Sequence, residues 1–447
     1  MSGASARSGP ARRSSARSAR ARWTTSATAP GPRRASAAAR SPSSRTATSS
    51  GPTAAARRWP RSTTRSATRA SEGAALRAAA RAFLDAAPAP AALADPDWER
   101  VAGRAEEERL APLLYALGRE LPLPDAARAR LRAAWLAFGR QHLQGVAELR
   151  ALLGAFEGAG IDVIPLKGPA LAEALYRDPG LRPFTDLDLL VRRQDAARAV
   201  AVLGELGYRH LGWQRSLAYE LAHAPAACFV AGGGALPVDL HWGLVGFPAG
   251  TAPLAPGAEA SVWERAVATE RWGRRVLALA AEDLVLYLAL HLAVHHPLAG
   301  LVWRLDLALL LRRHGPALDW DALVARAGAW RARGALYFAL AAVEYAFAPG
   351  VPGAPLAALR PRGPRGALLD RLARRGDERG LGDHLVALLV MDRLADVGRA
   401  LAAGVAPPAA WARSRYGTAR AARAYTRHYA RLAVAAARAA AALVRPR

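Results

Sequence analysis

The feature that most constrains the fold is a change in hydrophobic periodicity near residue 160. Before it, apolar residues recur at the spacing of an α-helix, as in the row Leu143, Val146, Leu149, Leu153 and Phe156. Between residues 161 and 242, short apolar runs alternate with polar segments that contain Gly and Pro. Helical spacing returns after about residue 260. This order predicts an α+β chain in which a small mixed β-sheet core lies between N- and C-terminal helical regions.

The core segment predicts two helices and five strands. One helix is expected to start at Gly168-Pro169 and the other to span Gln194–Leu206. The run Gly232-Gly233-Gly234 predicts a hairpin between the last two strands. The predicted strands are Ile161–Leu166, Phe184–Val191, Tyr208–Trp213, Ala226–Ala231 and Ala235–Trp242. The clearest later helices are Glu282–His296, Val302–Arg313, Trp320–Arg331, Gly334–Ala348 and Gly380–Leu394.

The two ends of the chain carry most of its formal charge of +26. Residues 1–71 contain 15 arginines and no acid, and residues 409–447 contain 9 arginines and no acid. Residues 72–408 hold 38 basic and 36 acidic residues, so the middle of the chain is not predicted to be a general nucleic-acid binder. The basic termini leave a contact with nucleic acid, an anionic membrane or an acidic partner open.

The composition also divides the chain. Residues 1–75 contain no Leu, Ile, Val, Phe, Tyr or Cys, and they are therefore predicted to be disordered. Their Arg, Ser and Ala content is similar to a transit peptide, but a solvated basic tail or a misassigned start codon is favoured. Ordered structure is expected from Glu72–Leu76. The predicted parts are a helical lead-in at 76–158, the α/β core at 159–259, a helical domain at 260–408 and a basic helix at 409–447.

Cysteine content and hydropathy predict a cytoplasmic protein. The single cysteine, Cys228, excludes an intramolecular disulfide and fits a reducing compartment. No run of 18 or more uncharged residues is typical of a membrane span, and no apolar signal region follows the start. Cys228 itself is expected to be a small core residue.

Three aspartates suggest a metal site. Asp186 and Asp188 are two residues apart on a predicted strand, so their side chains should point to the same face. Asp239 lies on a later predicted strand and would complete an acidic trio if the two strands are neighbours. Carboxylates this close repel each other and tolerate the arrangement best around a divalent cation such as Mg²⁺. The alternative is a solvated acidic strand end.

Lys167 and Gly168 predict a phosphate contact where the first strand turns into a helix. Lys167 is the only lysine among the 62 Lys and Arg residues, which suggests that a compact ammonium is needed there. Gly168 lets the backbone approach a ligand closely. Arg182 is expected either to bind phosphate or to pair with Asp178 or Asp186.

Two groups of histidines accompany these residues. His241 shares a strand face with Asp239, so it is expected to orient that acid, touch substrate or sit in the core. His291, His295 and His296 lie on one predicted helix, and a structural or substrate-facing role is favoured over zinc binding. Asp306 is expected to cap a helix or form a salt bridge within the helical domain.

From about residue 95 to 320, and more faintly to Tyr416, the chain resembles an uncharacterised nucleotidyltransferase family of the polymerase-β-like superfamily. The resemblance is carried by Leu166-Lys167-Gly168, Tyr176, Arg182, Asp186-Leu187-Asp188, Gly207-Tyr208, Val238-Asp239-Leu240-His241-Trp242, His291 and Trp303-Arg304-Leu305-Asp306. It implies a nucleotidyltransferase core in which Asp186 and Asp188 are metal ligands and Asp239 is the third acid. The superfamily has a Gly-Ser turn, whereas here Lys167 precedes Gly168 and Pro169 follows it, so phosphate handling is expected to differ.

These residues together predict transfer of a nucleoside monophosphate from an NTP to an acceptor hydroxyl, with Mg²⁺ and release of pyrophosphate. The acceptor stays open among a small molecule, a sugar, a protein and a tRNA. The alternative is a catalytically altered nucleotide- or RNA-binding module with a regulatory or toxin-like role. The predicted catalytic and metal-binding residues are Asp186, Asp188 and Asp239, and the predicted substrate- and phosphate-binding residues are Lys167, Gly168, Arg182 and His241.

Overall fold

A computed structural model describes residues 63–88, 93, 96–118, 121, 123–212, 215–245, 254–297, 300–375 and 381–444. Residues 1–62, for which disorder was predicted, lie outside this described part. Residues 63–75 belong to helix α1 (Thr63–Asp85), so ordered structure begins earlier than the expected Glu72–Leu76. Alanine supplies the helix propensity that these residues need in the absence of large apolar side chains.

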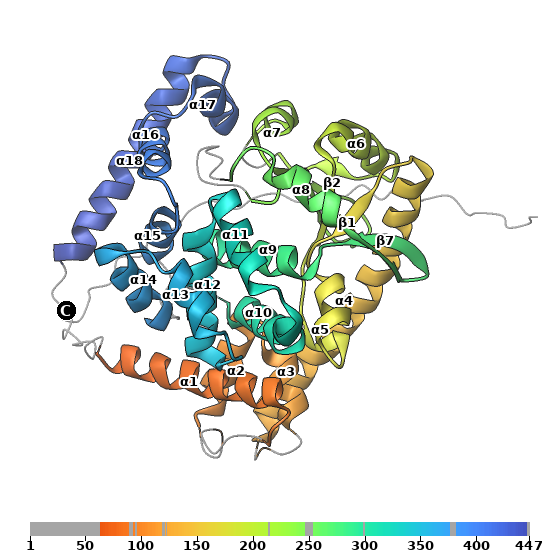
Figure 1. The fold of residues 1–447 in the computed structure, drawn as a ribbon, viewed down its shortest axis with the longest axis vertical. Helices are drawn as coiled ribbons and strands as arrows, with labels where there is room; N and C mark the ends of the chain where they lie inside the picture. The colour runs from red at the N-terminus through yellow and green to blue at the C-terminus, as the bar shows by residue number, and fades with distance from the viewer. Residues whose placement is uncertain are drawn as a thin grey trace, which may run out of the picture. The chain divides into compact units, whose positions relative to one another are not determined.

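A five-stranded mixed sheet forms the core, in the order β1-β2-β5-β4-β3. Figure 1 labels its strands β1 and β2. Its only parallel pair is β2 with β5, and the other neighbours are antiparallel. Glycines 233 and 234 have positive φ between β4 and β5, as the predicted hairpin requires. The strands are β1 (Val163–Pro165), β2 (Leu187–Val191), β3 (Arg209–His210), β4 (Ala226–Val230) and β5 (Val238–His241).

The strands are shorter than the sequence patterns predicted. Of the predicted strand Tyr208–Trp213, whose last residue lies outside the described part, Arg209 and His210 form β3 and pair with β4, while Tyr208 packs into the core. The predicted Ala235–Trp242 pairs only from Val238 onwards. A short helix, α7 (Leu217–His223), was not predicted, and Ser216 caps its start by accepting a hydrogen bond from the backbone of Tyr219.

One long N-terminal helix supports one face of the sheet. The helix α4 packs Leu149, Leu152, Leu153 and Phe156 into the same core as the strand residues Leu187 and Val238. The helices of the lead-in and core are α2 (Trp98–Glu107), α3 (Ala111–Leu117), α4 (Asp125–Gly158), α5 (Pro169–Leu175) and α6 (Ala196–Glu205). Both predicted core helices are present, and α5 begins at Pro169.

The segment after residue 260 is not purely helical, which corrects the prediction for 260–408. A hairpin of β6 (Val267–Arg271) and β7 (Arg274–Ala278) follows α8 (Ala258–Arg265). Trp272 and Gly273 form its turn, both with positive φ. The strand β7 contacts β1 and α4, so the hairpin braces the edge of the core.

The C-terminal region is a helical assembly around α12, most of whose residues are buried. Asp392 caps the start of α12. The predicted helix Gly380–Leu394, whose first residue lies outside the described part, is shorter than predicted, because α15 ends at Leu389 and Leu394 begins the next helix. The predicted final helix is two helices, because the chain turns at Gly417 with φ 57°. The helices are α9 (Ala281–His295), α10 (Leu301–His314), α11 (Trp320–Trp330), α12 (Arg333–Phe347), α13 (Gly353–Leu359), α14 (Gly363–Arg375), α15 (Leu381–Leu389), α16 (Leu394–Val405), α17 (Ala409–Tyr416) and α18 (Ala421–Val444).

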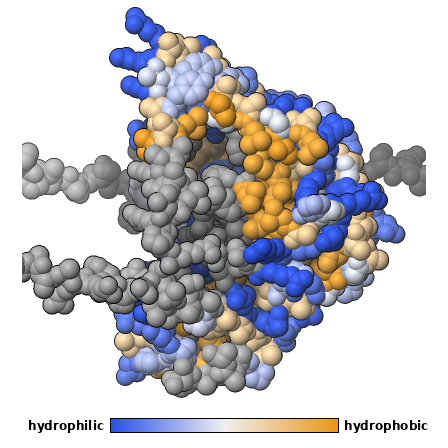
Figure 2. Space-filling model, turned by 90° about the vertical axis from the view of Figure 1, so that its left-hand side faces the viewer, coloured by the Kyte–Doolittle hydropathy of each residue, from blue (hydrophilic) through white to orange (hydrophobic). Residues whose placement is uncertain are grey.

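Hydrophobic residues also reach the surface. Figure 2 shows a continuous apolar area on one face of the molecule. Leu394, Leu401 and Val405 of α16 are among the exposed large apolar side chains. None of the described helices has both the length and the apolar character needed to cross a bilayer.

Candidate active site

The parallel pairing of β2 with β5 places two of the predicted acids side by side. Asp188 lies directly opposite Asp239 in the register, so both side chains point to the same face of the sheet. All five residues of β2 are buried, and Asp188 is 4% exposed. The neighbouring strands that the acidic trio required are therefore present in the fold.

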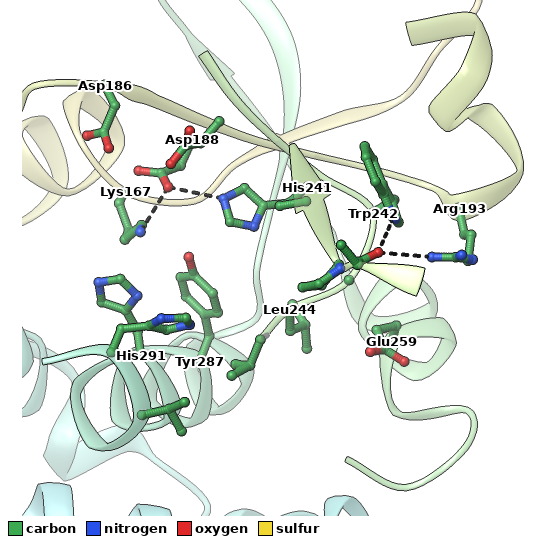
Figure 3. Close-up of a pocket in the computed structure, with 18 of the residues that line it drawn as sticks. Lys167, Asp186, Asp188, Arg193, His241, Trp242, Leu244, Glu259, Tyr287 and His291 are labelled. Atoms are coloured by element: carbon green, nitrogen blue, oxygen red, sulfur yellow. Dashed lines mark hydrogen bonds and ion pairs between the residues drawn. The ribbon is translucent and has the colours of Figure 1, made fainter. Parts of the chain in front are cut away.

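Asp188 is held by two partners on one oxygen atom. The Nζ atom of Lys167 lies 2.8 Å from Oδ1 of Asp188, and Nε2 of His241 donates a hydrogen bond to the same oxygen at 3.2 Å (Figure 3). Burial alone would raise the pKa of Asp188, but Lys167 and then His241 hold it well below its ordinary value. Burial alone would likewise lower the pKa of Lys167, and Asp188 holds it above its ordinary value. Asp188 and Lys167 are thus an ion pair, and His241 orients Asp188 rather than Asp239.

Asp186 lies just before β2, at a bend rather than within the predicted strand Phe184–Val191. Burial raises its pKa to about 6, and the charges of Asp188 and Asp239 add to this effect. Lys167 and Arg109 oppose the shift without cancelling it. The positive charges near Asp186 are therefore too few to stabilise its ionised carboxylate fully.

The donor atoms suit a divalent cation. Ligand atoms of Asp188, Asp239 and His241 lie within 4.8 Å of one another, the one such group among the described residues. Asp186 is not one of these three, although it lines the same cleft. Oxygen ligands from carboxylates are the type that Mg²⁺ prefers, and an added cation would relieve the repulsion that raises the pKa of Asp186. The residues fit a divalent-cation site, and the identity of the ion and the individual ligand roles stay predictions.

Gly168 is required by the backbone. Its φ of 55° and ψ of −122° lie in a region that only glycine adopts readily. A Cβ atom at this position would lie 3.3 Å from the carbonyl oxygen of Asp186, which is tighter than ordinary contact. The turn therefore brings Lys167 against the acids, whereas its predicted phosphate contact stays a prediction.

Arg182 has a partner that the sequence did not indicate. Its Nη2 and Nε atoms donate to Asp306 of α10 at 2.7 and 3.3 Å, and the hydroxyl of Tyr176 also donates to Asp306. The predicted structural partners Asp178 and Asp186 are therefore wrong, and Asp306 ties α10 to the core rather than pairing within the helical domain. Arg182 is buried yet still lines the cleft, so its predicted phosphate contact remains a prediction.

The site opens into a cleft of about 1160 Å³, which we call the aspartate cleft. Tyr287 and His291 of α9 face Lys167 and Asp188 across it (Figure 3), and His295 of the same helix also lines it. Burial lowers the pKa of His291 well below its ordinary value and that of His295 to about 4, and the nearby Lys167 acts in the same direction. Both imidazoles are therefore neutral at pH 7, so they can face substrate as hydrogen-bonding groups rather than as cations.

Several residues of the cleft were missed by the sequence analysis. Arg109 has a left-handed backbone with φ 58°, and its guanidinium lies 5.4 Å from the ring centre of Trp303. Nothing in the sequence distinguishes Arg109 from the many other arginines. Cys228, expected in the core, pairs in register with Asp239 and is half-buried, and burial and then Asp239 raise the pKa of its thiol.

The end of the cleft away from the acids combines arginines and aromatic rings. The guanidinium of Arg192 lies 4.4 Å from the ring centre of Trp263. Trp411 and Arg415 reach the cleft from α17. The backbone N–H of Ser216 donates to Oγ of Ser414 at 2.8 Å, which fastens α17 beside α7. The C-terminal region therefore supplies part of the cleft wall.

A family model described as an uncharacterised nucleotidyltransferase matches residues 94–348. The chain belongs to this family. The match covers the five-stranded sheet, the β6–β7 hairpin and helices α9 to α12, whereas Trp411 and Arg415 of this nucleotidyltransferase lie beyond it. The mixed α+β architecture agrees with a nucleotidyltransferase core. Neither the curated proteins nor the solved structures contain a match to the chain.

Proposed function

We propose that this nucleotidyltransferase moves a nucleoside monophosphate from an NTP to the hydroxyl of an acceptor, with Mg²⁺ and release of pyrophosphate. The observation that carries the proposal is the register of Asp188 opposite Asp239, with Lys167 on Asp188. Asp186, Asp188 and Asp239 would hold the metal. When bound, Mg²⁺ supplies positive charge against the triphosphate and the leaving pyrophosphate.

The protein residues carry out binding, orientation and proton removal. The acceptor oxygen forms a bond to the α-phosphorus while the bond from that phosphorus to the bridging oxygen of pyrophosphate breaks. Asp239 takes the proton of the acceptor hydroxyl. Lys167, the Gly168 turn and Arg182 bind phosphate oxygens, and His241 keeps Asp188 in position. Most of the rate enhancement then comes from positioning and charge neutralisation.

A second candidate is a nucleotide- or RNA-binding module with a regulatory or toxin-like role. One observation favours it. Lys167 and His241 both contact Oδ1 of Asp188, which is an oxygen atom that could otherwise bind the metal. The absence of a Ser beside Gly168 points the same way. In this case NTP or RNA would bind without transfer.

A tRNA acceptor belongs to the first proposal, and the basic termini would then contact the RNA.

The test is transfer of label from α-labelled NTPs with Mg²⁺ into fractions of a cell lysate, measured together with pyrophosphate release. Wild type should label one class of acceptor, and Asp188→Asn should not. Asp321→Asn, an exposed acid on α11, is the matched control and should behave as wild type. If no fraction takes up label while NTP still binds to wild type, the binding module replaces the enzyme.

A further inference from the structure

A second cleft lies in the C-terminal helical region, with a volume of about 950 Å³. It is formed where α11 ends, α12 begins and the segment between α13 and α14 passes by. Six arginines and one acid line it, and we call it the arginine cleft. These residues are Arg331, Arg333, Arg360, Arg362, Arg365, Arg393 and Asp392.

The acid offsets only one of the six positive charges. Both carboxylate oxygens of Asp392 accept backbone N–H groups, from Arg333 at 2.8 Å and from Gly334 at 2.9 Å. Arg365 is 3.7 Å from Asp392, and it donates to the carbonyl oxygens of Leu389 and Met391 at 2.7 Å each. Arg333 likewise donates to a carbonyl oxygen, that of Ala358. Carbonyl groups fix the guanidiniums in place but leave their full charge in the cleft.

Three of the arginines have no acid at all within contact distance among the described residues: Arg331, Arg362 and Arg393. Only Arg360 has a close carboxylate partner, Asp370 at 2.7 Å. Like charges that share one hollow repel, and the repulsion persists over about 8 Å at physiological salt. An anion in the cleft would remove it.

Arg331 lies where glycine would be tolerated. It ends α11 with φ 60° and ψ 41°, a left-handed conformation that commonly ends helices and that glycine or asparagine adopts more readily. Ala348 ends α12 in the same way. Replacing Arg331 with glycine therefore removes the guanidinium without opposing the backbone conformation.

We propose that the arginine cleft binds a small anion that carries two or more phosphate groups. Guanidiniums match phosphate oxygens geometrically, and the cleft has the size of a small-molecule site. The six arginines, set against Asp392 and the Asp370 partner of Arg360, leave four positive charges, which is more than the roughly −2 charge of one phosphate group. The site is distinct from the aspartate cleft and does not depend on the proposed transfer reaction.

The experiment uses the full chain in EDTA and inorganic tripolyphosphate as the probe, with binding measured by calorimetry at 0.15 M salt. The variant Arg331→Gly/Arg362→Gln/Arg393→Gln should lose at least 100-fold in affinity. The matched control is Arg132→Gln/Arg140→Gln/Arg150→Gln, three exposed arginines of α4 with the same change in net charge. It should lose less than threefold.

Arg331→Gly alone separates binding from folding. Because glycine accepts the left-handed backbone, its thermal unfolding midpoint should equal or exceed that of wild type, while affinity for tripolyphosphate falls about tenfold. Tripolyphosphate should raise the unfolding midpoint of wild type but not of the triple variant. The proposal is overturned if tripolyphosphate binds wild type and the triple variant equally, or not at all. It is also overturned if single-stranded RNA binds the same arginines at least 100-fold more tightly than tripolyphosphate does, which would make the cleft a nucleic-acid surface.

Discussion

In the aspartate cleft, most buried charges have an opposite charge within contact distance, whereas in the arginine cleft six cations share a hollow with one aspartate. Lys167 lies on Asp188, and Arg182 lies on Asp306. In the arginine cleft, Asp392 is engaged by backbone N–H groups, and Arg331, Arg362 and Arg393 lack acidic partners among the described residues.

The difference suggests how each cleft meets its ligand. Internal pairing holds the side chains of the aspartate cleft in place, and these ion pairs would have to rearrange for the proposed cation and phosphates to bind. In the arginine cleft, Arg331, Arg362 and Arg393 have no ion pair among the described residues to give up, so their charge is available to an external anion. Asp186 is the exception within the aspartate cleft, since its raised pKa shows a deficit of positive charge.

The largest expected effect is that of Asp188→Asn. The change removes a proposed metal ligand and the partner of both Lys167 and His241, so nucleotidyl transfer should fall by about 1000-fold or more. The measurement is pyrophosphate release with saturating Mg²⁺, with Asp321→Asn as the control. Activity within tenfold of wild type would show that internal pairing at Asp188 has no catalytic purpose.

Lys167→Arg tests whether the paired cation must be an ammonium. The guanidinium keeps the charge, but its planar fork does not fit the 2.8 Å contact in a turn fixed by Gly168. We expect kcat/KM to fall by about 100-fold, with the unfolding midpoint close to that of wild type. Arg150→Lys, a reverse exchange on exposed α4, should change nothing. A loss below threefold would mean that the solitary lysine is incidental.

Arg182→Met tests how much the buried ion pair between Arg182 and Asp306 contributes to the free energy of unfolding. Removing one partner of a buried ion pair leaves Asp306 without its counter-charge, so the free energy of unfolding should fall by about 3 to 5 kcal/mol. Arg130→Met breaks an exposed pair with Glu106 and should cost less than about 1 kcal/mol. The double variant Arg182→Met/Asp306→Asn should recover part of the loss, because an amide still accepts from Tyr176. Equal losses in Arg182→Met and Arg130→Met would contradict the role of burial in this comparison.

The sequence predicted the elements that carry the chemistry better than it predicted their partners. Alternating apolar residues around Asp188 and Asp239 identified both strands, and Gly168 identified the turn, because these are local patterns. Local patterns do not specify which strands become neighbours. The pairing of β2 with β5 and the bond from Arg182 to Asp306, 124 residues away, are set by tertiary packing.

The errors have physical causes as well. The hairpin of β6 and β7 was missed because each strand is only five residues long and mixes charged with apolar side chains, so neither shows a clear alternation. Arg109 and the arginine cleft could not be recognised, since single arginines in a chain with so many carry no positional signal. Only the folded chain shows which of them converge and which of them have acids beside them.

Asp186→Asn is expected to have the smallest effect, and it should raise the stability of the metal-free protein, whereas Arg182→Met lowers stability. The pKa of Asp186 is raised to about 6 in the folded protein from an unfolded value near 4, so its ionised form destabilises the metal-free fold above pH 6. The metal-free wild type should therefore gain stability as the pH falls from 7 to 4. At pH 8 in EDTA the variant should melt about 1 to 3 °C above wild type, and the difference should vanish below pH 4. Adding Mg²⁺ should stabilise wild type more than the variant. A variant that melts below wild type at pH 8 without metal would show that Asp186 is already compensated, and the contrast between the paired acids and this unpaired one would be lost.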